Sequence, residues 1–116
     1  MPSPNEVLCG PSSAAQSVGF TWTFIGTATA RDYPIILKAP YGFRITETVS
    51  KCASGTDTAT IKIDGSAIGG SAHSVSSSES AVTRTSSNVV AKDQDVIVTM
   101  AGGAVDPQIT IKGVRT

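Results

Sequence analysis

Apolar and polar residues alternate in short runs along most of this chain. In the run GFTWTFIG, Phe20, Trp22 and Phe24 are separated by Thr21 and Thr23. Comparable runs lie at 43–51, 59–63, 96–100 and 109–112. An alternation with period two places the apolar residues on one face of a β-strand. No segment longer than one turn has the period of a helix, so the chain is predicted to be all-β.

Glycine, proline and aspartate mark the turns between these runs. Asp64-Gly65 tolerates positive φ at both positions, as a type I′ hairpin requires, so we expect 66–68 to pair back on 61–63. Pro34 has no backbone N–H and is expected at the start of a strand or on an edge. About eight short strands result. They predict an antiparallel β-sandwich with jelly-roll or Greek-key connections.

The strand expected from Phe43 to about Lys51 contains a conflict, because Glu47 falls on the face that alternation assigns to the core. The apolar residues of that face are Phe43, Ile45 and Val49, and the opposite face carries Thr46, Thr48 and Ser50. By the same alternation Cys52 points outward, unless a bulge shifts the register.

The segment Ser71 to Asn88 is unusually polar, since ten of its eighteen residues are serine or threonine. It has two interpretations, a flexible loop or an outer pair of strands. The pair of strands is favoured, because structureless loops of this length are uncommon in small domains. Its inward residues would be Val75, Ala81 and Val82. His73 is expected to be an exposed loop residue.

Length and charge limit the classes of function. At 116 residues the chain makes one domain, and nine basic residues balance nine acidic ones. The basic residues form no stripe with aromatics, which disfavours nucleic-acid binding. No apolar run approaches the ~20 residues of a membrane helix. Residues 1–17, with three prolines, read as an extended N-terminal arm or a frayed terminus, and 18–116 as the sandwich domain.

The residues able to perform chemistry are few. There is one histidine, His73, and no G-x-S-x-G motif, so no catalytic residues and no cofactor are expected. The two cysteines, Cys9 and Cys52, are too few for a zinc site or a disulfide framework. They are either two thiols or one disulfide, within or between chains. No metal is expected, although Asp93 and Asp95 are weak candidates for calcium ligands.

Apolar residues also occur at positions opposite a core face, as at Ile36 and Ile97. Such residues suggest that a partner covers one outer face of the sandwich. Ile36 and Ile97 are therefore candidate interface residues, together with the two cysteines.

The stretch from about Tyr33 to Met100 resembles small β-sandwich structural proteins of tailed-bacteriophage virions. The matching phrases are APYGFRITETVSKCASGTDTATIKIDGSAIGG and VSSSESAVTRTSSNVVAKDQDVIVTM. They share the order of an ITxxxxK strand, an ASGT turn, a TATIKI strand and a glycine-rich hairpin. The resemblance covers roughly two thirds of the chain.

This resemblance implies a non-enzymatic virion protein, made in the host cytoplasm, that attaches to capsid or tail as a decoration, fibre or accessory protein. Its partners would be major capsid or tail proteins, without nucleic acid or membrane. It would self-associate, with a trimer favoured. The alternative is a carbohydrate- or receptor-binding module on the same sandwich.

Overall fold

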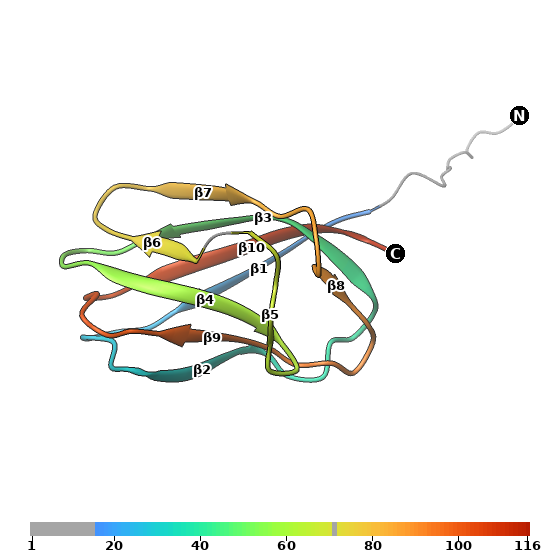
Figure 1. The fold of residues 1–116 in the computed structure, drawn as a ribbon, viewed down its shortest axis with the longest axis horizontal. Coiled ribbons are helices and arrows are strands. Elements are labelled where there is room, and N and C mark those ends of the chain that lie inside the picture. The colour runs from blue at the N-terminus through green and yellow to red at the C-terminus, as the bar shows by residue number, and fades with distance from the viewer. Residues whose placement is uncertain (1–15, 71) are drawn as a thin grey trace, which may run out of the picture.

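The computed structural model describes residues 16–70 and 72–116, which form two antiparallel sheets of five strands each (Figure 1). The strands are β1 (Ser17–Thr23), β2 (Arg31–Ile36), β3 (Phe43–Lys51), β4 (Asp57–Ile63), β5 (Ser66–Ala67), β6 (His73–Val75), β7 (Ser80–Thr83), β8 (Val89–Val90), β9 (Val96–Met100) and β10 (Gln108–Arg115). The predicted β-sandwich is confirmed. The expected N-terminal arm falls almost entirely outside the described residues.

The order of strands is that of a jelly roll. The first sheet runs β1-β10-β3-β7, with β8 also on β3, and the second runs β2-β9-β4-β5, with β6 also on β4. When the two-residue strands β5 and β8 are set aside, eight strands remain. Numbered along the chain, they form sheets in the orders 1-8-3-6 and 2-7-4-5, which is the jelly-roll arrangement of two Greek keys.

The turn chemistry agrees with the sequence. Asp64 and Gly65 have φ angles of 46° and 86° between β4 and β5, as the expected hairpin requires. Pro34 lies in β2, at the edge of the second sheet. The Ser/Thr-rich segment forms β6 and β7 as favoured, but β6 pairs with β4 and β7 with β3, so the segment crosses from one sheet to the other.

A β-bulge at Thr46 reverses the faces of β3. Lys112 of β10 pairs with Glu47 while the next residue, Gly113, pairs with Ile45, which leaves Thr46 as an extra residue. An extra residue moves every later side chain to the other face. The expectation that Thr48 and Ser50 point outward is therefore wrong, since they are 0% and 1% exposed. Cys52 is 4% exposed, in keeping with the exception made for a bulge. The bulge also moves Glu47 away from the core and removes the conflict in the pattern.

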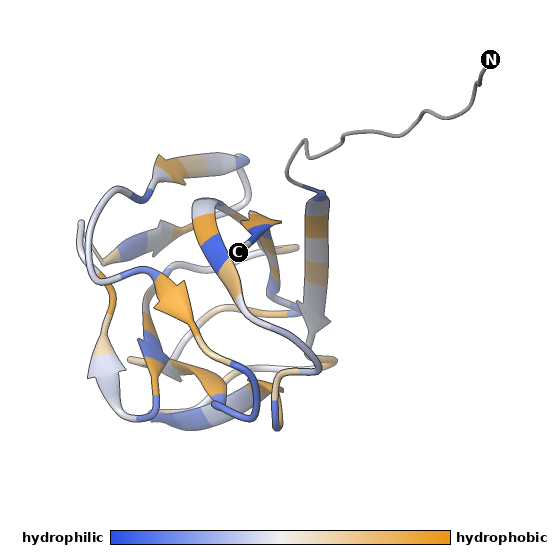
Figure 2. Ribbon diagram, turned by 90° about the vertical axis from the view of Figure 1, so that its right-hand side faces the viewer, coloured by the Kyte–Doolittle hydropathy of each residue, from blue (hydrophilic) through white to orange (hydrophobic). Residues whose placement is uncertain are grey.

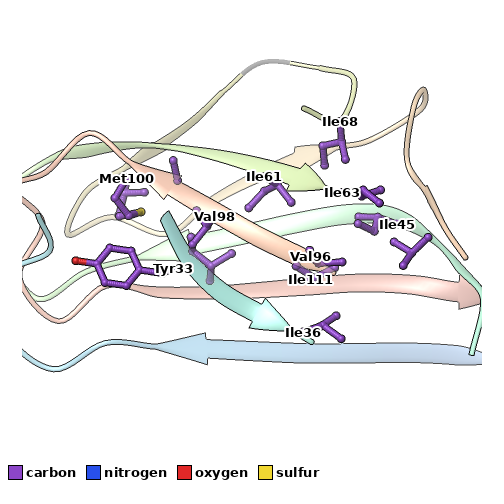
Figure 3. Packing of buried hydrophobic residues seen from close by; sticks show 14 of the residues in the cluster. Tyr33, Ile36, Ile45, Ile61, Ile63, Ile68, Val96, Val98, Met100 and Ile111 are labelled. Carbon is purple, nitrogen blue, oxygen red and sulfur yellow. The ribbon is translucent and has the colours of Figure 1, made fainter. Parts of the chain in front are cut away.

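The core lies between the two sheets and is built as the alternation predicts (Figure 3). Val96, Val98 and Met100 of β9 face inward, opposite Ile109 and Ile111 of β10, and each is at most 1% exposed. Val75 is buried as expected, whereas Ala81 is exposed and Val82 half-buried, because β7 lies at the edge of its sheet.

Candidate interaction surface

His73 is buried between the two sheets, so the expectation of an exposed loop residue is wrong. It begins β6 in the second sheet and is 0% exposed. Its Nδ1 lies 3.2 Å from Thr48 Oγ1 and its Nε2 lies 3.1 Å from the Ser80 carbonyl oxygen. Thr48 and Ser80 belong to the first sheet, so the imidazole joins the two layers. Burial lowers the pKa of His73 below 6.5, helped by the charge of Arg84 and opposed by the Ser80 carbonyl.

Arg84 extends this polar cluster. The guanidinium is buried, its Nε donates to Thr48 Oγ1 at 3.1 Å, and its Nη1 donates to the Gly69 carbonyl at 3.3 Å. Burial lowers the pKa of Arg84. Asn88 Nδ2 donates to the Ile45 carbonyl and, at 3.2 Å, to the Arg84 carbonyl. These polar groups hold backbone segments together and present no reactive atom to solvent.

Cys52 is a buried thiol. Its Sγ donates weakly to the carbonyls of Ser54, at 3.2 Å, and Gly55, at 3.5 Å. It is free, and burial keeps it from contact with a partner's thiol. A role for Cys52 in a disulfide between chains therefore has no support in its position. Cys9 lies outside the described residues.

The turn aspartates bind backbone amides of other loops. Asp95 Oδ1 accepts from the Lys38 N–H at 2.8 Å, and Asp57 Oδ1 accepts from the Gly102 N–H at 2.8 Å. Asp93 adopts a φ of 72° in its turn. Across the described residues, no three His, Cys, Asp or Glu side chains gather as metal ligands. The calcium candidates Asp93 and Asp95 thus gain no support from the geometry.

The surface hollows are shallow. One of about 220 Å³ is lined by Lys51, Cys52, Ala53, Asp106 and Gln108. Another of about 390 Å³ lies between the β4–β5 hairpin and β8, where Val89 is 56% exposed. Neither hollow is lined by the histidine. Within residues 16–70 and 72–116, no helix is long and apolar enough to span a bilayer.

The two predicted interface isoleucines have different positions. Ile36 is 7% exposed and packs in the core, so the expectation that it faces outward is wrong. A register shift between Pro34 and Ile36 turns its side chain inward (Figure 3). Ile97 lies on the outer face of β9, half-buried between its strand neighbours Pro34 and Lys62. Ile97 therefore remains a candidate contact.

A row of aromatic side chains follows β1 along the side of the sandwich. Phe20, Trp22 and Phe24 are half-buried and pack against the core. The Trp22 ring centre lies 5.3 Å from that of Tyr33 on β2, and the Phe20 ring lies 5.2 Å from that of Phe43. The three rings are half-buried and not fully enclosed, because β1 is an edge strand. In Figure 2, β1 stands at the outer edge of its sheet, with orange bands separated by pale ones along it.

Three large apolar side chains are exposed among the described residues: Ile25 at 91%, Leu37 at 67% and Val89 at 56%. Ile25 lies two residues beyond the end of β1 and directly after Phe24, so the half-buried aromatic row and the most exposed of these three residues adjoin. The sequence pattern revealed the aromatic row. It did not reveal that the row lies at a sheet edge, since strand order depends on distant pairing.

Comparison with known proteins identifies a fold. No family model matches the chain, and no curated protein matches its sequence. A similar solved structure is a chain from a structure described as the capsid asymmetric unit of cyanophage Pam1. The two chains have a TM-score of 0.53 and 18% identity, and the match covers 100% of each. At this identity the likeness extends to the fold of the whole chain.

Proposed function

We propose that this protein is a structural component of a bacteriophage virion, attached to the capsid and without enzymatic activity. The observation that carries the proposal is the likeness, over the full length of both chains, to a chain of the Pam1 capsid asymmetric unit. Jelly rolls are common in viral capsid domains, which adds weight to this assignment. Because the similar chain belongs to a capsid, decoration of the capsid is preferred to a place in the tail or a fibre.

The internal chemistry supports a structural role. The residues that might have served catalysis, His73, Arg84 and Cys52, are buried, and they form hydrogen bonds to the protein's own side chains and carbonyls. Buried, hydrogen-bonded polar clusters favour a rigid scaffold rather than a reactive site. The protein would be made in the host cytoplasm and assembled into the particle there.

The outer face of the second sheet is the proposed contact with a capsid protein. Ile97 is half-buried in the middle of this face, and its neighbours on adjacent strands are Pro34 and Lys62. An apolar residue in the centre of an outer face gains from being covered by a partner. Self-association belongs to the proposal as well. No strand of the described residues pairs with the outer edge of β1, and this edge favours a two-fold contact over the trimer that the sequence resemblance implies.

A reconstitution experiment tests the attachment. Tagged protein is mixed with particles purified from a phage deleted for this gene, and the particles are pelleted. We expect the wild-type chain to sediment with the particles and Ile97→Asp to stay in the supernatant. Ile97→Val, which keeps an apolar surface, should sediment like the wild type. Failure of the wild-type chain to sediment would overturn the proposal.

The alternative, a sugar-binding module, would need an exposed aromatic side chain on which a sugar ring could stack. All six aromatic side chains lie in the described residues, and each is buried or half-buried. Tyr41 has the guanidinium of Arg115 over its ring, 4.3 Å from the ring centre. Stacking on a sugar needs a free aromatic face, so no second function is proposed.

A further inference from the structure

The edge of β1 presents a row of backbone groups outward. At the two ends of the strand, the Phe24 N–H donates to the Pro107 carbonyl at 3.1 Å and the Gln16 carbonyl accepts from the Arg115 N–H at 2.8 Å. In an antiparallel ladder, residues whose backbone N–H and C=O bond to the neighbouring strand alternate with residues whose N–H and C=O point away from it. The even-numbered residues of β1 therefore bond to β10. The odd-numbered ones direct N–H and C=O away from the sheet: Ser17, Gly19, Thr21 and Thr23.

The other edges of the two sheets carry protective features against strand pairing, and β1 does not. The β2 edge contains Pro34, a register shift and the charged residues Arg31 and Asp32. The opposite edges consist of β5, β6, β7 and β8, of two to four residues each. β1 has seven residues, SVGFTWT, with no charge, no proline and an unbroken register against β10. Long, flat, uncharged edges are the ones that pair with another chain.

We propose that β1 is the self-association surface of this protein and that its occupant is β1 of a second copy, paired antiparallel about a two-fold axis at Phe20. In this register Ser17 lies opposite the partner copy's Thr23, and Gly19 opposite its Thr21. These are the residues whose backbone groups face outward, so they form the hydrogen-bonded pairs. Phe20 lies opposite Phe20 of the second copy. The two form a non-hydrogen-bonded pair, in which side chains approach most closely.

The side chains of β1 are complementary to themselves. Directly opposite residues share a face, so Val18 meets Trp22 and Phe20 meets Phe20 on the inner side. These are apolar pairs on a face that the monomer leaves half-covered. With no charge on β1, two copies meet without repulsion, and a charged partner strand would find no counter-charge. The second copy therefore fits this edge better than a charged strand does.

This inference specifies the self-association proposed above and rests on it, but not on the virion role. Its test uses the purified chain by itself, whereas the virion role is tested on particles, so either can fail while the other stands.

The solution mass is measured by light scattering after size exclusion, in reductant so that cysteines form no crosslinks. We expect twice the 11.8 kDa of the chain. Thr21→Pro removes one outward N–H, which faces no other strand in the described part of the chain, and should give a monomer. Thr21→Val keeps the N–H and the β-branched shape and should remain a dimer. Far-UV circular dichroism establishes that both variants are folded.

Two measurements on the wild type keep the test decisive if Thr21→Pro does not fold. The amides of Gly19, Thr21 and Thr23 should resist hydrogen exchange at high concentration and lose that protection on dilution. Emission from Trp22, the one tryptophan, should shift to the red on the same dilution. A wild-type monomer, a trimer, freely exchanging edge amides in the oligomer, or a folded Thr21→Pro variant that stays dimeric would each overturn the proposal.

Discussion

The imidazole of His73 and the hydroxyl of Thr48 face each other across the two sheets, 3.2 Å apart and fully buried. His73 belongs to β6 in the second sheet and Thr48 to β3 in the first. Ser50 Oγ adds a second link between the same strands, donating to the Ser74 carbonyl at 3.4 Å. A polar clamp thus replaces apolar packing at this part of the sandwich.

Removing the imidazole should destabilise the fold. His73→Ala leaves a cavity and takes a partner from the Thr48 hydroxyl and the Ser80 carbonyl, so we expect a loss of about 2–4 kcal/mol in the free energy of unfolding. Urea denaturation measures it. Ser77→Ala, an exposed change in the same polar segment, should alter the value by less than about 0.5 kcal/mol. Equal stability of the two variants would show that the clamp contributes nothing.

Stability should also fall as the solution becomes acidic. Burial lowers the pKa of His73 in the folded state below its ordinary 6.5. Below about pH 6.5 the unfolded chain therefore binds a proton that the folded chain does not, and the free energy of unfolding decreases until the folded pKa is reached. His73→Gln, which does not titrate, should show a shallower decrease over this interval. Identical pH profiles for the two proteins would contradict this account.

The bulge at Thr46 brings β10 very close to β3 at one glycine. A Cβ on Gly113 would collide with the Arg44 carbonyl oxygen of the neighbouring backbone. Gly113→Ala should therefore lower the free energy of unfolding by about 1–3 kcal/mol. Gly19→Ala is the matched control, since its new Cβ meets its nearest atom at 4.0 Å, and should change stability by less than about 1 kcal/mol at the same protein concentration. If Gly113→Ala left the free energy of unfolding unchanged, the two strands would not approach each other this closely.

Much of the fold could be predicted because one face of each central strand is apolar. The pattern in β4, β9 and β10 identified the buried side chains, and Asp64-Gly65 identified a hairpin. The pattern could not locate the bulge at Thr46, because an extra residue has no signature of its own. Only Glu47, a charged residue on the face that alternation assigned to the core, indicated that the register of this strand changes. His73 was misjudged because it lies in the Ser/Thr-rich segment, whose polar composition gave no sign of a buried side chain.

The thiol of Cys52 should be inert in the folded protein. It is 4% exposed and its Sγ contacts the Ser54 carbonyl, so in a Cys9→Ser background we expect slow reaction with a thiol reagent. Unfolding in urea should restore the rate of a free thiol. Rapid native labelling, or a crosslinked dimer through Cys52 on oxidation, would show that this residue is accessible to a partner.

The central proposal, a capsid-attached structural role, is tested most directly by quantitative mass spectrometry of density-gradient-purified phage particles from a culture that produces the chain. The account predicts that this protein is present in a fixed ratio to the most abundant capsid protein and that the ratio holds across the particle band. Its absence from the particles while it is abundant in the cell lysate would contradict the account.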